Sequence, residues 1–533
     1  MNERFSAMTP AAVATAAMLL GCLALVLLGI HLQSQVHINH DVAWIAHSAA
    51  WLLDGGRFGT DILDPNPPLA WFLMLPAVAA ARAGIVPEIA AVQAWTWMLC
   101  ATGLALSLAV LQPRALVLGR LETTSLMLVA TAVIAILPIG NFGQRDVVAF
   151  ALMLPYLSAL LGRIGGKPPG RSLSILIGLC AGVGLCLKPF LAAVPLLAEP
   201  LLAWFARNPR SLIRAETLAM AAAIAAYALA ILLFARDYLE FALPLVRAVY
   251  WAYDNPAYLV LARYKDAVWP AVYGIGIALA TLSFTRVHFM LLAWIGGFSA
   301  SYWMQGKGFP YHAYPILGAS CVFLAYAVVR AGRSVWRSAM LRRPALRWLV
   351  LAVLMLVAIP VLREPFGQAE RWYQSANPET GDWGRARQLL IDRLGSLGVG
   401  PGVFVYAFST HPHPGFPTVN YLGARWTGRT VTQFAVPAHV RRQEVSDPVR
   451  LDEIERAMAL QLSMIVEDLQ RHPPAYVMVE ARQRRLGLAF RRFDDLAYYG
   501  QDPDFARLWS CYVEIEPIEQ IRLFRRRDDC QAS

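Results

Sequence analysis

The sequence predicts a polytopic α-helical membrane protein that ends in a small α/β domain. Hydrophobic residues make up 57% of the 533 residues and charged residues only 16%, with a mean hydropathy of +0.46. A soluble domain typically carries about 25% charged residues, so the composition excludes one large soluble core. After about residue 364 the composition becomes that of a globular domain. We therefore expect a membrane-embedded domain over 1–363 and an α/β domain over 364–533.

About eleven apolar segments are expected to cross the membrane, because each is close to or above roughly 18 residues and carries few or no charges. We expect the first segment to be an uncleaved anchor. Its apolar run is longer than a typical signal-peptide core, and "HLQSQVH" offers no small-x-small cleavage site. The expected spans are 11–30, 88–112, 122–139, 147–163, 172–187, 190–206, 214–235, 267–285, 288–304, 312–330 and 347–363.

Basic residues between these segments predict the orientation of the chain. A net charge of +11 would suit a nucleic-acid partner, but many of the basic residues lie in short gaps between spans, which is the positive-inside pattern. All the gaps that carry these basic residues lie on the cytoplasmic side of the membrane under two conditions. The N-terminus must be cytoplasmic, and 67–84 must be an interfacial helix that does not cross the membrane. The residues of these gaps are Arg114, Arg120, Arg163, Lys167, Arg171, Arg207, Arg210, Arg214, Arg286, Arg330, Arg333, Arg337, Arg342, Arg343 and Arg347.

The tail after residue 364 has the pattern of alternating strands and helices. Short apolar runs at 402–408 and 475–480 predict buried strands, and 452–472 predicts an amphipathic helix between them. "CYVEIE" and "IRLFRRR" predict a final strand pair. Whether Cys511 and Cys530 form a disulfide is open. The other cysteines lie in apolar segments and are expected to be small core residues: Cys22, Cys100, Cys180, Cys186 and Cys321.

The first loop on the outer side, 31–87, gathers carboxylates at two helix starts. "NHDVAWIAHSAAWLLDGG" (39–56) indicates one short amphipathic helix. Its Asp41 is open to two interpretations, because Asn39 or Asp41 can cap the helix and Asp41 can also act chemically. Asp64 and Asn66 precede a second helix, which we expect to start at Pro67 with Asn66 as its cap.

Two further charged positions lie at the expected outer ends of spans. "GNFGQRD" presents Arg145 and Asp146, which form either a solvated neighbour pair of little energetic value or an acid held at the membrane surface. Lys188 lies in "GLCLKPF". A charge deep in a span costs about 2.5–3.5 kcal/mol, so Lys188 either snorkels to the interface or binds an anion.

The loop "QGKGFPYH" carries Lys307, Tyr311 and His312, which suit either an interfacial belt or close approach of a phosphate. "THPHP" (410–414) has two histidines but no neighbouring set of cysteines or carboxylates, so a zinc site is not expected there. No nucleotide-binding loop is present in usable context. An enzyme on the outer face would therefore receive its activated donor through the membrane.

The order of these parts resembles the GT-C fold of lipid-linked-sugar glycosyltransferases, the broad group that includes bacterial aminoarabinose transferases and protein O-mannosyltransferases. The resemblance covers most of residues 1–330 and rests on the early acid in "HDVAWIAHSAAWLLDGG", then "DPNPPLAWF", "GQRDVVAF" and "LKPF". The chain departs from many relatives at Val42, where they have Glu, and at Asn66, where they have Lys.

The resemblance implies a fold, a reaction and residue roles. The donor would be a polyprenyl-phosphate sugar, and the acceptor an envelope lipid, glycan or protein on the periplasmic face of a bacterial inner membrane. Asp41 matches the general base of an inverting transfer, and Asp146 matches a second acidic position that orients the acceptor or a cation. Some relatives use a divalent metal ion and others do not. This chain shows no clear ligand set, so no cofactor is assigned and a divalent metal ion stays an open alternative.

Basic side chains aimed at the leaving phosphate would stabilise its growing charge. The candidates for this donor phosphate site are Lys188, Lys307, His312, Arg145 and Arg263, and those for substrate binding are Asp64, Asn66 and Tyr311.

Two other functions compete with a transferase. A transporter or flippase would have ionisable groups at mid-span and paired halves with broken helices. No internal repeat is visible, and Lys188-Pro189 is the one feature that favours a transporter. A structural membrane subunit would leave the loop carboxylates as helix caps alone.

Overall fold

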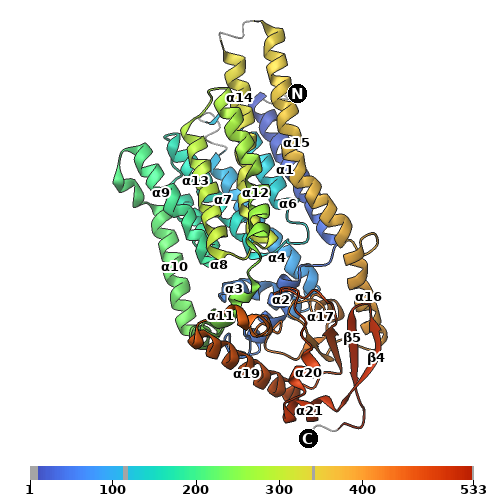
Figure 1. Cartoon of the computed structure of the whole chain (residues 1–533). Helices are drawn as coiled ribbons and strands as arrows, with labels where there is room; N and C mark the ends of the chain where they lie inside the picture. Colours follow the sequence, from blue (N-terminus) through green and yellow to red (C-terminus); the bar gives the residue numbers. More distant parts are fainter. Residues whose placement is uncertain (1–9, 112–117, 339–342, 531–533) are drawn as a thin grey trace, which may run out of the picture. The chain divides into compact units, whose positions relative to one another are not determined.

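The computed structural model describes residues 10–111, 118–338 and 343–530 (Figure 1). The chain forms two compact units that do not follow its linear order. Unit 1 comprises Met1–Gln35, Thr96–Ala226 and Pro256–Gln374, and unit 2 comprises Val36–Trp95, Tyr227–Asn255 and Ser375–Ser533. The expected division into domains 1–363 and 364–533 stays a prediction. Arg114 and Arg342, which we counted in the basic gaps, lie outside the described residues.

All eleven expected spans coincide with helices. Seven described helices are long and apolar enough to cross a membrane, which confirms a polytopic helical protein. Their bounds are α1 (Pro10–Ser34), α4 (Glu88–Leu111), α7 (Arg145–Ile164), α9 (Ala193–Ala206) with the preceding short helix η2 (Pro189–Ala192), α10 (Ala215–Phe234), α14 (Pro310–Arg337) and α15 (Pro344–Ala376).

The other four expected spans are shorter or more polar helices. These are α6 (Arg120–Ala135), α8 (Arg171–Leu187), α12 (Ala257–Ala280) and α13 (Arg286–Gln305). The expected start of α12 at residue 267 is wrong, since the helix begins at Ala257. Arg263, Lys265 and Asp266 interrupt the apolar run there, so hydropathy alone places the start too late.

The packing of unit 1 separates inner helices from outer helices. α7 and α14 are almost entirely buried within the protein, whereas α1, α10 and α15 expose most of their surface. The exposed side chains of the outer helices are large and apolar, such as Leu20, Phe234 and Leu356. Apolar helix faces that do not pack against other parts of the protein are suited to contact with lipid chains.

Unit 2 begins with two short helices, α2 (His40–Leu53) and α3 (Leu69–Arg82). The expectation of one helix over 39–56 is confirmed. The expected cap of α3 is wrong, because Pro68 stands at the cap position and makes no side-chain hydrogen bond. Asn66 instead donates to Asp64 Oδ1 from its backbone N at 2.9 Å and from Nδ2 at 2.8 Å.

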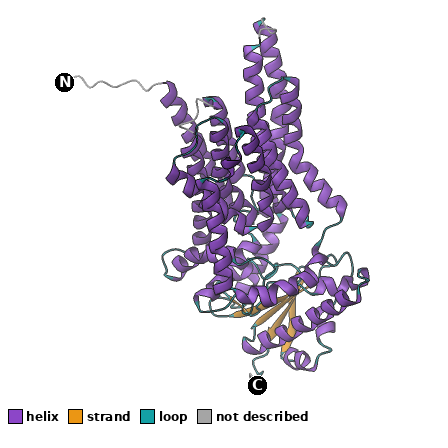
Figure 2. Cartoon of the chain, turned by 90° about the vertical axis from the view of Figure 1, so that its left-hand side faces the viewer, coloured by secondary structure: helices purple, strands orange, loops and turns teal. Residues whose placement is uncertain are grey.

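Unit 2 also contains a five-stranded sheet, which confirms the expected α/β region (Figure 2). The strand order is β2-β1-β3-β5-β4, with β1, β2 and β3 parallel and β4 and β5 antiparallel. A disulfide joins Cys511 to Cys530, which settles the open pairing. The bounds are β1 (Phe404–Phe408), β2 (Arg425–Trp426), β3 (Tyr476–Glu480), β4 (Tyr512–Ile518) and β5 (Ile521–Arg526).

Several helices complete unit 2 around this sheet. α19 is the amphipathic helix expected over 452–472 and precedes β3. The helices are α11 (Leu243–Val249), α16 (Asp382–Ser396), α17 (Thr418–Leu422), α18 (Val436–Arg441), α19 (Pro448–Arg471), α20 (Asp495–Tyr499) and α21 (Pro503–Trp509).

A buried polar network ties α7, α9 and α10 together at one end of unit 1. Arg214 forms an ion pair with Glu199 at 2.6 Å, and Tyr156 donates a hydrogen bond to the same carboxylate. Arg163 pairs with Glu216, also at 2.6 Å. Each charged group here has a partner of opposite sign, which is the condition for burying charge at acceptable cost.

We expect Arg214→Leu to destabilise the protein by about 3–5 kcal/mol, because Glu199 would be left buried without its cation. Arg236→Leu is the matched control, since it breaks the exposed pair with Glu240 and should cost under about 1 kcal/mol. Thermal unfolding in detergent micelles measures both changes. Equal shifts of the unfolding midpoint would contradict a special role for the buried network.

Candidate functional site

A buried ion pair in unit 1 joins two residues that are 42 positions apart. Lys188 Nζ lies 2.8 Å from Asp146 Oδ2 and 3.0 Å from Oδ1, and both side chains are buried. Asp146 is the second residue of α7, where the partial positive charge of a helix start favours a carboxylate. Pro189 ends α8, because the residue before a proline is driven into the extended backbone that Lys188 adopts. The Lys-Pro sequence thereby turns the lysine side chain out of the helix.

The loop between α13 and α14 completes the surroundings of Lys188. Gln305 Oε1 accepts a hydrogen bond from Nζ at 2.9 Å, and the Tyr311 ring centroid lies 5.4 Å from the same atom. Gly306 and Gly308 adopt left-handed backbone angles, φ 64° and 59°, which side chains with a Cβ rarely adopt. These two glycines allow the tight turn that brings Gln305 and Tyr311 to the same ammonium group.

Further basic side chains gather at this pair. Lys188, Arg145, Lys307 and Arg263 all interact electrostatically with His312, whose ring is buried. Arg263 also donates a hydrogen bond to the carbonyl oxygen of Gly308. We refer to Arg145, Lys188, Arg263, Lys307 and His312 as the basic cluster.

The basic cluster places Arg145, Lys188, Lys307 and Arg263 near the buried ring of His312, and Lys188 pairs with Asp146. Within the described residues, Arg145 Nε and His312 Nδ1 are buried and make no hydrogen bond. The structure thus brings together all the donor phosphate candidates of the sequence, with Asp146 and Tyr311 beside them. Several basic side chains, together with a guanidinium N–H that makes no hydrogen bond, are an arrangement that fits a phosphate group.

Asp41 lies in unit 2, at the second position of α2. The side chain of Asn39 accepts the hydrogen bond from the backbone N of Asp41 at 2.9 Å, so Asn39 is the helix cap. The sequence left the cap open between Asn39 and Asp41, and the structure assigns it to Asn39, while the chemical role of Asp41 stays a prediction. Its Oδ1 lies 3.6 Å from His40 Nε2, and about a quarter of the side chain is exposed.

Histidines that the sequence did not single out surround Asp41. The ring centroids of His40 and His411 are 4.5 Å apart, and His411 Nδ1 accepts a hydrogen bond from the backbone N of His413. Burial lowers the pKa of His40 to about 3, and it lowers the pKa of His411 and of His413 well below 6.5. All three rings are therefore neutral at pH 7. The signal that could have found His411 and His413 was "THPHP", which we considered only as a zinc motif.

Asp64 and Asn66 form a turn in unit 2. Asp64 is buried, and its Oδ2 accepts a hydrogen bond from Trp44 Nε1 at 2.9 Å, while its Oδ1 accepts the two bonds from Asn66. These contacts fasten the loop before α3 to α2. Substrate binding by Asp64, Asn66 and Tyr311 stays a prediction. Among the described residues, no group of three or more His, Cys, Asp or Glu side chains is arranged to hold a metal ion.

The structure is that of a polytopic α-helical membrane protein with the GT-C fold and a C-terminal α/β region. The structure is similar to that of ArnT from Cupriavidus metallidurans in the apo state, with a TM-score of 0.54 over 96% of this chain and 98% of that chain. The two sequences are 12% identical, so the likeness concerns the fold. No family model and no curated protein matches the sequence.

Acidification should destabilise unit 2, because His40 and His47 are buried in neutral form with pKa values near 3 and 4. In the unfolded chain they take up protons below about pH 6.5. Stability is therefore complete above that pH and falls by about 1.4 kcal/mol per pH unit for each such histidine below it.

The thermal unfolding midpoint between pH 7.5 and 5 measures this loss. His411→Asn should flatten the dependence, since Asn can still accept the bond from His413 but does not titrate. The exposed His31→Asn is the control and should leave the slope unchanged. A midpoint that does not move over this range would contradict the burial of neutral histidines.

Proposed function

We propose that the protein is an integral membrane glycosyltransferase that transfers a sugar from a polyprenyl-phosphate donor to an envelope lipid, glycan or protein. The observation that carries this proposal is the basic cluster around Asp146, in a chain with the GT-C fold. The absence of a nucleotide-binding loop in the sequence also favours a lipid-linked donor. In this proposal the protein resides in a bacterial inner membrane, with the reaction on the periplasmic face.

The basic cluster suits the leaving group of such a transfer. As the bond between the anomeric carbon and the phosphate oxygen breaks, its electron pair stays on the phosphate, which gains negative charge. Lys188 is held by Asp146 and Gln305 before any donor binds, so little reorganisation is needed when a phosphate approaches. Fixed donors that require no reorganisation are the most effective stabilisers of such charge.

Asp41 is the proposed general base. It would take the proton of the acceptor hydroxyl while the acceptor oxygen forms its bond to the anomeric carbon, with inversion at that carbon. Asn39 caps α2, and the partial exposure of the Asp41 carboxylate allows an acceptor to reach it. We derive no step through a metal ion, since the described residues present no suitable ligand group.

A transporter or flippase of a lipid-linked substrate is the second candidate. The observation in its favour is the break between α8 and η2 at Lys188-Pro189, beside a buried ion pair. Broken helices with buried charges line the substrate sites of many transporters. The two functions differ in their product, because only a transferase cleaves the bond between sugar and phosphate.

We expect Asp41→Asn to lower the rate of sugar transfer by about 100-fold to 10,000-fold and to keep donor binding, because the amide cannot accept the proton. Transfer from a radiolabelled polyprenyl-phosphate sugar in proteoliposomes measures the rate. Asp382→Asn changes an exposed carboxylate of the first turn of α16 and is the control. Transfer by Asp41→Asn at the wild-type rate would remove Asp41 as the base. Movement of intact donor across the bilayer without cleavage would favour the transporter.

A double-mutant cycle tests Lys188 and Asp146. Each of Lys188→Gln and Asp146→Asn leaves one buried charge unpaired, so each should lower the unfolding midpoint, whereas the double variant should recover much of the loss.

Donor binding should behave differently in the same cycle. Loss of the Lys188 ammonium group should weaken binding of polyprenyl phosphate by about 10-fold to 100-fold, which corresponds to one charge-assisted hydrogen bond. The double variant should show the same loss, because it also lacks this group. The exposed Lys167→Gln is the control. A double variant that regains both stability and donor binding would show that the pair is structural only.

A further inference from the structure

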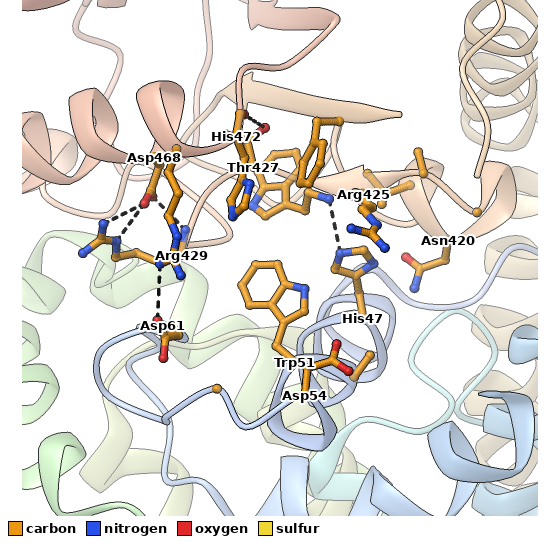
Figure 3. Close-up of a pocket in the computed structure, with 18 of the residues that line it drawn as sticks. His47, Trp51, Asp54, Asp61, Asn420, Arg425, Thr427, Arg429, Asp468 and His472 are labelled. Carbon is orange, nitrogen blue, oxygen red and sulfur yellow. Dashed lines mark hydrogen bonds and ion pairs between the residues drawn. The ribbon is translucent and has the colours of Figure 1, made fainter. Parts of the chain in front are cut away.

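A cavity of about 500 Å³ lies within unit 2, apart from every residue to which the proposed transfer assigns a role (Figure 3). The C-terminal half of α2, the end of α3, β1, the segment 419–429 and the end of α19 form its walls. The volume is in the range of small-molecule sites, about 300–1,000 Å³.

Aromatic rings form part of the wall. Trp51 is half-buried, and the rings of Trp44 and His47 contact it edge-on at centroid distances of 5.9 and 5.7 Å, which fix its orientation. Phe404 and His472 stack in parallel, 4.8 Å apart. The face of an aromatic ring carries negative partial charge, so it attracts the C–H groups on the face of a pyranose ring.

A buried amide on the wall has an unused acceptor. Asn420 is 7% exposed, and its Nδ2 donates hydrogen bonds to Ala43 O at 3.0 Å and Glu88 Oε1 at 2.8 Å. Within the described residues its Oδ1 has no hydrogen-bond partner. A buried acceptor without a donor destabilises the protein, and a ligand hydroxyl that donates to it would remove that cost.

His47 offers a donor that complements this acceptor. Burial lowers its pKa to about 4, so the ring is neutral at pH 7. Its Nε2 accepts a hydrogen bond from the backbone N of Trp426 at 3.3 Å, which leaves the ring proton on Nδ1. Figure 3 shows the side chains of His47 and Asn420 pointing toward one another. A donor and an acceptor in such a pair match a hydroxyl group, which both accepts and donates.

The charged groups of the wall balance one another. Asp54 and Arg82 form two hydrogen bonds of 2.6 Å, and Asp468 pairs with Arg429 at 2.8 Å. Asp61 lies 3.8 Å from Arg471, and one further acid, Glu88, and one further base, Arg425, bring the formal sum of the wall to zero. A free phosphate or a lipid headgroup phosphate would need excess positive charge, which this cavity lacks, whereas a neutral polyhydroxylated ring needs fixed donors and acceptors of both kinds.

We propose that this cavity binds a neutral pyranose residue of a glycan. The sugar ring stacks on Trp51, and one hydroxyl donates to Asn420 Oδ1 and accepts from His47 Nδ1. This binding does not depend on the proposed transfer, since none of the transfer residues lines the cavity.

Isothermal titration of the full-length protein in lipid nanodiscs tests the proposal, with maltotriose and the N-acetylglucosamine trisaccharide as probes. Maltoside and glucoside detergents must be absent, because their sugar heads would compete. We expect saturable binding of at least one probe. Trp51→Leu should weaken it by about 10-fold or more, while Trp51→Phe, which keeps an aromatic face, should retain most of it. Trp383→Leu removes an exposed tryptophan of α16 outside the cavity and should have no effect.

Three results would overturn the proposal: no binding of either trisaccharide, sugar binding that Trp51→Leu leaves unchanged, or binding of inorganic phosphate that Trp51→Leu abolishes. Asp41→Asn should bind the trisaccharide as tightly as the wild type does, whether or not the protein transfers sugar. Failure of the transfer assay and failure of sugar binding are therefore separate outcomes.

Discussion

Charge in apolar surroundings must be paired, and this constraint organises unit 1. The helices there carry few charges, and four buried carboxylates each pair with a basic side chain: Asp146 with Lys188, Glu199 with Arg214, Glu216 with Arg163 and Glu122 with Arg333. Each pair joins different helices or a helix and a loop, so the electrostatic requirement also determines which helices are neighbours. An unpaired member would cost more than the packing of its helix could offset.

The pair at Lys188 differs from the others in its surroundings. Around Arg214 and Glu199 the charges of the network are matched. Around Lys188, by contrast, the ion pair with Asp146 lies among further basic side chains, since Lys188, Arg145, Lys307 and Arg263 all act on the buried ring of His312. Structural pairing of Lys188 does not require these additional basic side chains, whereas a site that receives an anion does. The difference in charge balance is the physical basis for assigning the two networks different roles.

Unit 2 meets the same constraint in two ways: buried histidines are neutral, and the acidic side chains around the cavity are equal in number to the basic ones. His40, His411 and His413 are neutral because burial disfavours their charged forms. The cavity near Trp51 balances its acids and bases. The two units thus present different chemistry: a cluster of basic side chains suited to phosphate in one, and an aromatic, charge-balanced cavity suited to hydroxyl groups in the other.

The sequence by itself determined the elements and their types. Apolar runs identified all eleven helical segments, and short β-rich runs identified β1, β3, β4 and β5, because burial and backbone hydrogen bonding impose these periodicities locally. It also selected the members of the basic cluster, since charges at the ends of apolar segments are conspicuous. It misplaced the start of α12, where charges within the helix hide its first turns.

Only the tertiary structure decided which distant residues meet. The contact of Lys188 with Asp146, the choice of Asn39 over Asp41 as cap, the histidines beside Asp41 and the unused oxygen of Asn420 all depend on atomic positions. Unit 2 combines segments from three parts of the chain, which a linear division cannot reveal. Periodicity records whether a side chain is buried, but the identity of its partners depends on how the elements pack in three dimensions.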